Sequence, residues 1–171
     1  MVLDPVMTAQ SGDCLLAEDA IEALKGLLCK VDIITPNIPE AEILLGQTID
    51  TPKKMHAAAE ALSKHYHTSV LLKGGHLTGA QCPDIFYDHA KQTHFPFISP
   101  RVDTQNTHGT GCSLSAAIAS YLAQGATEYE AIKKAKHYLF NALTSAKDFR
   151  IGKGQGPIHH FYALRRESYV I

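Results

Sequence analysis

Short apolar runs alternate with amphipathic segments along the chain. The runs at residues 1–4, 31–34 and 70–72 are rich in aliphatic side chains and too short for helices, which predicts buried strands. In the segments between them, apolar residues recur every three or four positions, which predicts helices. This alternation is typical of an α/β fold in which a mostly parallel sheet is flanked by helices.

Proline and glycine mark the ends of the helices predicted in the first half. Pro39 suits the first turn of a short helix that Gly46 closes, and a longer helix begins at Thr51-Pro52. An earlier helix, after a turn at residues 11–13, has an apolar face of Ala20, Ile21, Leu24, Leu27 and Leu28. The face of the longer helix consists of Met55, Ala58, Ala59, Leu62 and Tyr66.

The second half predicts two strands and two helices. The strands are expected near residues 84–88 and 93–97, and a helix follows residues 109–111. The apolar face of that helix holds Leu114, Ala117, Ile118, Tyr121 and Leu122. A last long helix carries Ile132, Ala135, Leu139, Ala142 and Leu143. Because no repeat or linker interrupts the pattern, we expect one domain over residues 1–171.

Polar side chains follow three of the predicted strands. Asp4, Asn37 with Glu40, and Lys73 each come just after an apolar run. In open parallel sheets, ligands bind beyond the carboxyl ends of the strands. We therefore regard these four residues as candidates for a binding site at that edge of the sheet.

The composition excludes several classes of protein. Hydrophobic residues make up 45% of the 171 positions and charged residues 19%, which is globular rather than disordered. The formal net charge of -1 gives no basic excess for nucleic acid or an anionic membrane. No apolar run reaches the length of a membrane span, and the first residues do not resemble a signal peptide. We expect a cytoplasmic protein.

Cysteine and histidine spacing does not predict a metal site. The four cysteines form no C-x-x-C pair, so we expect Cys14, Cys29 and Cys82 to be reduced and mostly buried. The ten histidines include no pair spaced to place two ligands on one helix face.

The segment Asn106-Thr-His-Gly-Thr-Gly-Cys112 carries the strongest chemical signal. Its glycines allow a tight turn and a close approach of the backbone to a ligand. The helix that follows presents free N–H groups and the positive end of its dipole. Together these features suit a transferring phosphoryl group. A glycine turn that only caps a helix explains the spacing about equally well.

This segment resembles the glycine-rich signature of ribokinase-like kinases. Most of that superfamily has aspartate at the last position, whereas the hydroxymethylpyrimidine and phosphomethylpyrimidine kinases of thiamin biosynthesis have cysteine, as here. The resemblance implies that Cys112 is the general base, and that the amides of Gly109, Thr110 and Gly111 form an anion hole. The positive end of a helix favours a thiolate, which is compatible with this role. The alternative is that Cys112 is a small buried residue at a tight helix start.

Two further segments resemble motifs of the same superfamily. Asn37-Ile-Pro-Glu40 is similar to its N-x-x-E motif, which implies that Asn37 and Glu40 organise magnesium through water. The alternative is ordinary capping of a helix by both residues. Asp4-Pro-Val-Met7 is similar to D-P-V-M, in which the aspartate lies close to the metal and the phosphates. The alternative for Asp4 is a turn at the end of a strand.

Two glycine-rich segments complete the resemblance. Lys73-Gly74-Gly75-His76 is similar to K-G-G-H, which implies that Lys73 and Gly75 bind the nucleotide and that Lys73 faces its phosphates. A surface lysine is the alternative. Residues 152–157 resemble the family's C-terminal segment, and we expect no catalytic role there. The four motifs occur in the family's order.

The resemblance implies a three-layer ribokinase-like fold and an ATP- and Mg²⁺-dependent kinase. The implied reaction phosphorylates an aminopyrimidine hydroxymethyl group and then the resulting monophosphate. The family is longer at its N-terminus, so we expect that the first strands, the lid and much of the acceptor pocket are absent. A dimer, or another partner that covers an open sheet edge, is therefore expected. Two alternatives are a non-catalytic nucleotide-binding remnant or assembly subunit, and a kinase of pyridoxal-type vitamers.

Overall fold

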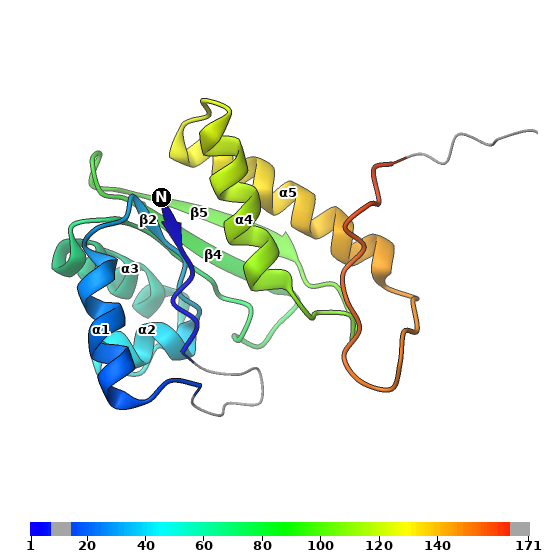
Figure 1. The fold of residues 1–171 in the computed structure, drawn as a ribbon, viewed down its shortest axis with the longest axis horizontal. Helices are drawn as coiled ribbons and strands as arrows, with labels where there is room; N and C mark the ends of the chain where they lie inside the picture. The colour runs from blue at the N-terminus through cyan, green and yellow to red at the C-terminus, as the bar shows by residue number, and fades with distance from the viewer. Residues whose placement is uncertain (8–14, 165–171) are drawn as a thin grey trace, which may run out of the picture.

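A five-stranded mixed sheet forms the centre of the molecule (Figure 1). The computed structural model describes residues 1–7 and 15–164. Strands β1 (Val2–Leu3), β2 (Ile33–Ile34) and β3 (Ser69–Leu72) are parallel neighbours. Strands β4 (Gln81–Asp88) and β5 (Thr93–Pro100) add an antiparallel hairpin next to β3. The hairpin strands are longer than predicted because their pairing continues from Gln81 opposite Pro100 to Asp88 opposite Thr93.

All five predicted helices form. They are α1 (Glu18–Leu28), α2 (Ile38–Leu45), α3 (Pro52–Tyr66), α4 (Thr110–Ala123) and α5 (Glu128–Ala146). Their ends follow the local signals in the sequence. Gly46 closes α2 in the left-handed conformation, with φ 65°, and the side chain of Thr51 caps α3 by accepting a hydrogen bond from Lys54 N.

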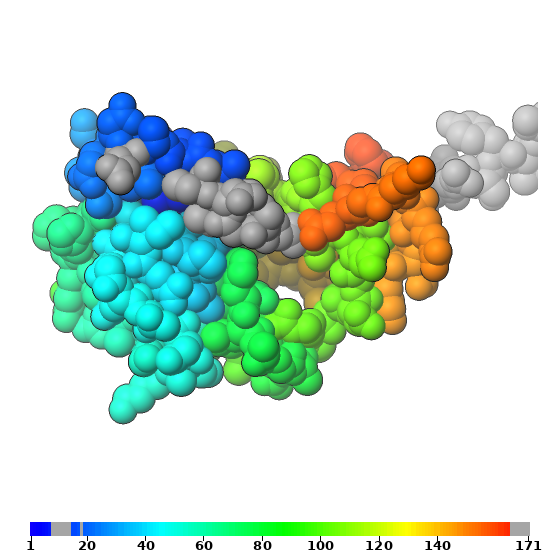
Figure 2. Space-filling model, turned by 90° about the horizontal axis from the view of Figure 1, so that it is seen from below, coloured from blue at the N-terminus to red at the C-terminus, as the bar shows by residue number. Residues whose placement is uncertain are grey.

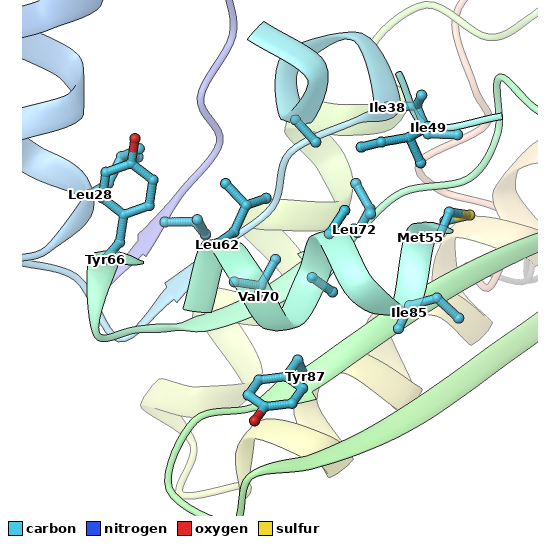
Figure 3. Close-up of a cluster of buried hydrophobic side chains, with 14 of the residues drawn as sticks. Leu28, Ile38, Ile49, Met55, Leu62, Tyr66, Val70, Leu72, Ile85 and Tyr87 are labelled. Carbon is cyan, nitrogen blue, oxygen red and sulfur yellow. The ribbon is translucent and has the colours of Figure 1, made fainter. Parts of the chain in front are cut away.

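The sheet divides the core into two halves, which gives the three-layer fold. Successive strand residues point to opposite faces. On one face, sheet residues such as Ile34, Val70 and Ile85 pack with α1, α2 and α3 (Figure 3). On the other face, Ile33 and Phe86 pack with α4 and α5. Helices thus cover both sides of the sheet (Figure 1).

Two expectations about single side chains are wrong. Leu27 was assigned to the apolar face of α1, but it is 49% exposed, whereas Leu28 is fully buried. Adjacent helix residues point in different directions, and only a narrow face of α1 contacts the core, so Leu27 and Leu28 are not both buried. Cys29 was expected to be buried, and it is exposed just beyond the end of α1, while Cys82 is half-buried. Cys14 and the turn predicted at residues 11–13 lie outside the described residues.

Strand β1 lies at one edge of the described sheet. Its residues pair with β2, in the register Val2 with Ile33 and Leu3 with Ile34, and both β1 residues are half-buried. Within the described part of the chain, no strand pairs with the other side of β1. A short apolar parallel strand at an edge is unusual, because parallel strands are normally covered.

No helix in the described residues is both long enough and apolar enough to cross a membrane.

The burial of α1 predicts very different costs for two adjacent substitutions. Leu28→Ala should lower the free energy of unfolding by about 2–5 kcal/mol, because it leaves a cavity beneath the helix. Leu27→Ala is the matched control and should change stability by less than about 0.5 kcal/mol. Urea unfolding followed by circular dichroism measures both values. Equal losses for the two variants would contradict the packing of α1.

Candidate active site

The carboxyl ends of β1, β2 and β3 meet at one edge of the sheet. The parallel pairing continues past the strands, because Thr35 N donates to Leu3 O at 3.0 Å and Lys73 N donates to Pro36 O at 2.8 Å. This pairing brings Asp4, Asn37 and Lys73, three of the residues singled out in the sequence, to neighbouring positions.

Asp4 and Lys73 form a mostly buried ion pair at this edge. Lys73 Nζ lies 2.8 Å from Asp4 Oδ1, and the two side chains are only 16% and 11% exposed. The hydroxyl of Thr35 donates to the same oxygen at 3.0 Å. The alternative that Lys73 is a surface lysine does not fit this burial. The ion pair fixes an ammonium group and a carboxylate beyond the strand ends.

The first turn of α4 lies directly against this ion pair. A Cβ atom placed on Gly111 would be 3.2 Å from Asp4 Oδ2 and 3.4 Å from Lys73 Nζ. Gly109 caps the helix with φ 83°, a left-handed conformation that favours glycine. The amides of a helix's first turn have no partners within the helix, so that of Gly111 is available to an anion near Lys73, whereas Thr110 N donates to Thr107 O in the preceding loop at 3.3 Å.

Cys112 is exposed at the third residue of α4. The alternative that it is a small buried residue at the helix start does not fit this exposure. The first turn is braced instead by Ser115, whose hydroxyl donates to Gly111 O at 3.2 Å and to Cys112 O at 3.1 Å. The thiol is therefore accessible beside a helix N-terminus.

The loop before α4 is held by the C-terminal part of the chain. Asn106 is buried, and its Nδ2 donates to Ala146 O at 2.6 Å and to Phe149 O at 2.8 Å. His108 N donates to Gly156 O at 3.1 Å. A Cβ on Gly156 would lie only 1.9 Å from Asn106 Oδ1, so the two segments are in close contact. Residues 152–157 thus brace the glycine segment.

Asn37 and Glu40 form a complete capping box at the start of α2. Asn37 N donates to Glu40 Oε2 at 2.7 Å, and Glu40 N donates to Asn37 Oδ1 at 2.9 Å. Glu40 is only 2% exposed. Burial raises the pKa of its carboxyl above the ordinary 4.5, and the charge of Asp4 adds to this, while the amides of Asn37 and Met7 and the charge of Lys73 oppose it.

The electrostatics of this corner fit a bound cation. The charge of Asp4 disfavours the charged form of the Glu40 carboxyl, and the ammonium group of Lys73, which pairs with Asp4, opposes this effect. Magnesium is commonly bound by one or two carboxylates while it keeps several waters. Among the described residues, no group of three or more His, Cys, Asp or Glu side chains is arranged to hold a metal by itself. A cation here would therefore need water or phosphate oxygens as further ligands.

Several residues of this site were missed by the sequence analysis. Thr35 binds Asp4, and Asp84 accepts a hydrogen bond from Gly74 N at 2.8 Å. Arg101 donates to Gly79 O at 2.9 Å and to Gly75 O at 3.1 Å, which holds the loop after Lys73. Gly75 itself is exposed in that loop. These contacts depend on the pairing of distant strands, which the local pattern does not contain.

A hollow of about 600 Å³ lies next to the glycine segment. The C-terminal segment that contributes most of its lining is coloured orange on the face shown in Figure 2. It is lined by Gln105, Asn106 and residues 147–154, and by none of the predicted site residues. Its wall includes three cationic side chains, Lys147, Arg150 and Lys153, and one acidic side chain, Asp148. Through Asn106, the hollow adjoins the loop that leads to Cys112.

The chain is similar in sequence to known kinases. Residues 1–159 match the family model of phosphomethylpyrimidine kinase. A hydroxymethylpyrimidine/phosphomethylpyrimidine kinase of Rhizobium meliloti is 45% identical over 163 residues, which are 94% of this chain and 60% of that protein. The chain thus spans about three fifths of the length of this curated relative.

Two solved structures share the fold. A phosphomethylpyrimidine kinase of Clostridium difficile is 38% identical, with a TM-score of 0.70 over 83% of this chain and 56% of that chain. A pyridoxal kinase of Staphylococcus aureus in complex with AMP-PCP is 30% identical, with a TM-score of 0.84 over 97% of this chain and 59% of that chain. The fold is therefore ribokinase-like.

The buried carboxyl of Glu40 predicts an unusual dependence of stability on pH. Because its pKa is raised in the folded state, the folded protein binds the proton more tightly than the unfolded chain, and stability falls as pH rises from 4.5 through the folded pKa. Glu40→Gln should therefore become progressively more stable, relative to the unsubstituted chain, over that range.

Glu130 provides the matched control, because it occupies the same position in the capping box of α5. Hydrogen bonds from Thr127 lower the pKa of its exposed carboxyl, so Glu130→Gln should show the opposite slope with pH. Urea unfolding at a series of pH values gives both slopes. A slope of the same sign in the two variants would show that burial of Glu40 does not control its titration.

Proposed function

Because the chain belongs to the phosphomethylpyrimidine kinase family, we propose that it transfers the γ-phosphoryl group of ATP to 4-amino-5-hydroxymethyl-2-methylpyrimidine and to its monophosphate. This is a step of thiamin biosynthesis. The observation that carries the proposal is the exposed Cys112 thiol in the helix turn that lies on the Asp4–Lys73 ion pair. That arrangement combines a base, anion-binding amides and a phosphate-facing cation.

The proposed reaction divides the work among these groups. Cys112 accepts the proton of the substrate hydroxyl as its oxygen attacks the γ-phosphorus, and the bond to the β-phosphate oxygen breaks to release ADP. The amides of Gly109, Thr110 and Gly111 bind the equatorial oxygens of the transferring group, and Thr110 N exchanges its hydrogen bond to Thr107 O for one of these oxygens. Lys73 steadies the phosphates. Catalysis by positioning and electrostatics is what phosphoryl transfer requires.

Magnesium would be held at the corner formed by Asp4, Asn37 and Glu40. It would supply positive charge to the phosphate oxygens. Burial, with a smaller contribution from the charge of Asp4, raises the pKa of Glu40, and this supports the assignment because a nearby cation would stabilise the charged carboxylate. Asn37 Oδ1 and the Glu40 carboxylate are also engaged in capping α2, so we propose contact through water rather than a direct bond from both.

ATP is the proposed phosphoryl donor. AMP-PCP, which the pyridoxal kinase of Staphylococcus aureus binds, is a non-hydrolysable ATP analogue. Gly75 and the loop that Arg101 holds would lie on the nucleotide side, and residues 152–157 would close it. The use of ATP is consistent with our expectation that the protein works in the cytoplasm.

Two alternatives remain testable. A pyridoxal-type vitamer kinase is less well supported, because identity to the solved pyridoxal kinase is 30%, against 38% and 45% for the pyrimidine kinases. A nucleotide-binding remnant without turnover is the other alternative. We also propose that the edge of β1 that no described strand pairs with is covered in the working protein, by a second copy of the chain or by a partner.

Replacement of the proposed base tests the mechanism. Cys112→Ala should lower kcat by roughly 10²–10⁴-fold in an assay of ADP release with the pyrimidine alcohol, because the hydroxyl proton loses its acceptor. Cys112→Asp should keep part of the activity, since a carboxylate can accept the proton. Cys29→Ala is the control, because Cys29 is also exposed but has no proposed role. Undiminished kcat in Cys112→Ala would remove this thiol from the mechanism.

Calorimetry with ATP separates the enzyme from the remnant. We expect binding that strengthens when Mg²⁺ is added, and Glu40→Gln should lose most of that gain. Binding without any release of ADP would favour the remnant, and absence of binding would exclude both hypotheses. A mass measurement in solution on the same sample tests whether a second copy of the chain covers β1, and a monomer would exclude that form of cover.

A further inference from the structure

Asp84 is a buried charge in an apolar strand. It lies in β4 directly before Ile85 and Phe86, both of which are in the core, and it is 7% exposed. Removing a carboxylate from water is costly unless it is paired and hydrogen-bonded. Asp84 has both kinds of partner, because Oδ1 accepts from Gly74 N and Oδ2 pairs with Lys136 Nζ of α5.

These contacts fix the backbone from which Lys73 projects. On one side, Lys73 N donates to Pro36 O at 2.8 Å, and on the other, Gly74 N donates to Asp84 Oδ1 at 2.8 Å. Gly74 also lies so close to β4 that an added Cβ would be 1.9 Å from Pro83 O. The main chain at residues 73 and 74 therefore has little freedom to shift.

The position of Lys73 Nζ depends on that backbone. Its ammonium lies between Asp4 and the first turn of α4, 2.8 Å from the carboxylate and 3.4 Å from where a Gly111 Cβ would be. A displacement of the main chain would move the ammonium away from both. Small displacements of this kind can reduce phosphoryl-transfer rates strongly, because positioning supplies much of the catalysis.

Lys136 completes the arrangement from the opposite layer. It lies one turn after Ile132, which is buried against the sheet, and its side chain is 15% exposed. By pairing with Oδ2, the ammonium of Lys136 orients the carboxylate so that Oδ1 faces Gly74. A buried ion pair often stabilises a protein no more than apolar side chains of similar volume would. The Asp84–Lys136 pair is therefore better explained by the geometry that it fixes than by a gain in stability.

We propose that Asp84 is a positioning residue for phosphoryl transfer, held by Lys136 and acting on Lys73 through the amide of Gly74. This role rests on the proposed function. Asp84 would touch neither substrate nor nucleotide.

Asp88 offers a matched control in the same strand. It is 4% exposed, it accepts backbone N–H groups of Lys91 and Ala90, and it pairs with the side chain of Lys91. It lies at the other end of β4, away from Lys73. Asp88→Ala therefore removes the same kinds of contact without affecting the backbone of residues 73 and 74.

The kinetic test is a double-mutant cycle with Lys73. Asp84→Ala should lower kcat by roughly 10–100-fold with little change in KM for the pyrimidine, and Asp84→Asn, which keeps an oxygen acceptor for Gly74, should recover part of the loss. In a Lys73→Met background, Asp84→Ala should have almost no further effect, because the group it positions is gone. Asp88→Ala should leave kcat unchanged in both backgrounds.

Two results would overturn the proposal without affecting the proposed function. One is an active protein in which the effects of Asp84→Ala and Lys73→Met multiply independently. The other is slow hydrogen exchange of the Gly74 amide that persists in Asp84→Ala, since that amide should exchange much faster once its acceptor is lost. An unsubstituted chain that neither binds ATP nor releases ADP would instead refute the proposed function, and with it the role of Asp84.

Discussion

The contact between the Asp4–Lys73 ion pair and the first turn of α4 determines the rest of the site. An ammonium group near a helix N-terminus is repelled by the helix dipole, and a carboxylate there is attracted. Asp4 lies between the ammonium group and the helix N-terminus and interacts favourably with both, because one of its oxygens pairs with Lys73 and the other faces Gly111. The Lys73 ammonium group and the N-terminus of α4 can therefore lie side by side. Together they form a surface suited to an anion with several negative oxygens.

The close approach of α4 to the strand ends, and of other segments to one another, requires glycine at the points of contact. Gly111 brings α4 onto the ion pair, and Gly74 brings the end of β3 onto Pro83. Gly156 does the same for the C-terminal segment and Asn106. The glycines of the sequence motifs are therefore explained as much by packing between the layers as by contact with a ligand. A structural and a functional explanation of such motifs need not exclude each other.

The sequence predicted the elements well because their signals are local. The apolar face of α3 and the glycine that closes α2 follow from helical spacing and from backbone conformation alone. The packing of single side chains was predicted less well, as Leu27 illustrates, because the width of the buried stripe depends on the neighbouring layers. Asp84 and Lys136 could not be found by pattern, since they are 52 positions apart and meet only after β4 pairs with β3 and α5 covers the sheet.

The engagement of Glu40 in a capping box does not prevent a role in metal binding. A carboxylate has about four lone-pair positions, and the backbone amides of Asn37 and Met7 use only part of this capacity. The same hydrogen bonds hold the carboxylate rigidly, and burial makes its charge costly unless a cation is close. For the proposed magnesium site, the cap would fix the direction of the carboxylate, and a bound cation would offset the cost of its buried charge, to which the charge of Asp4 adds.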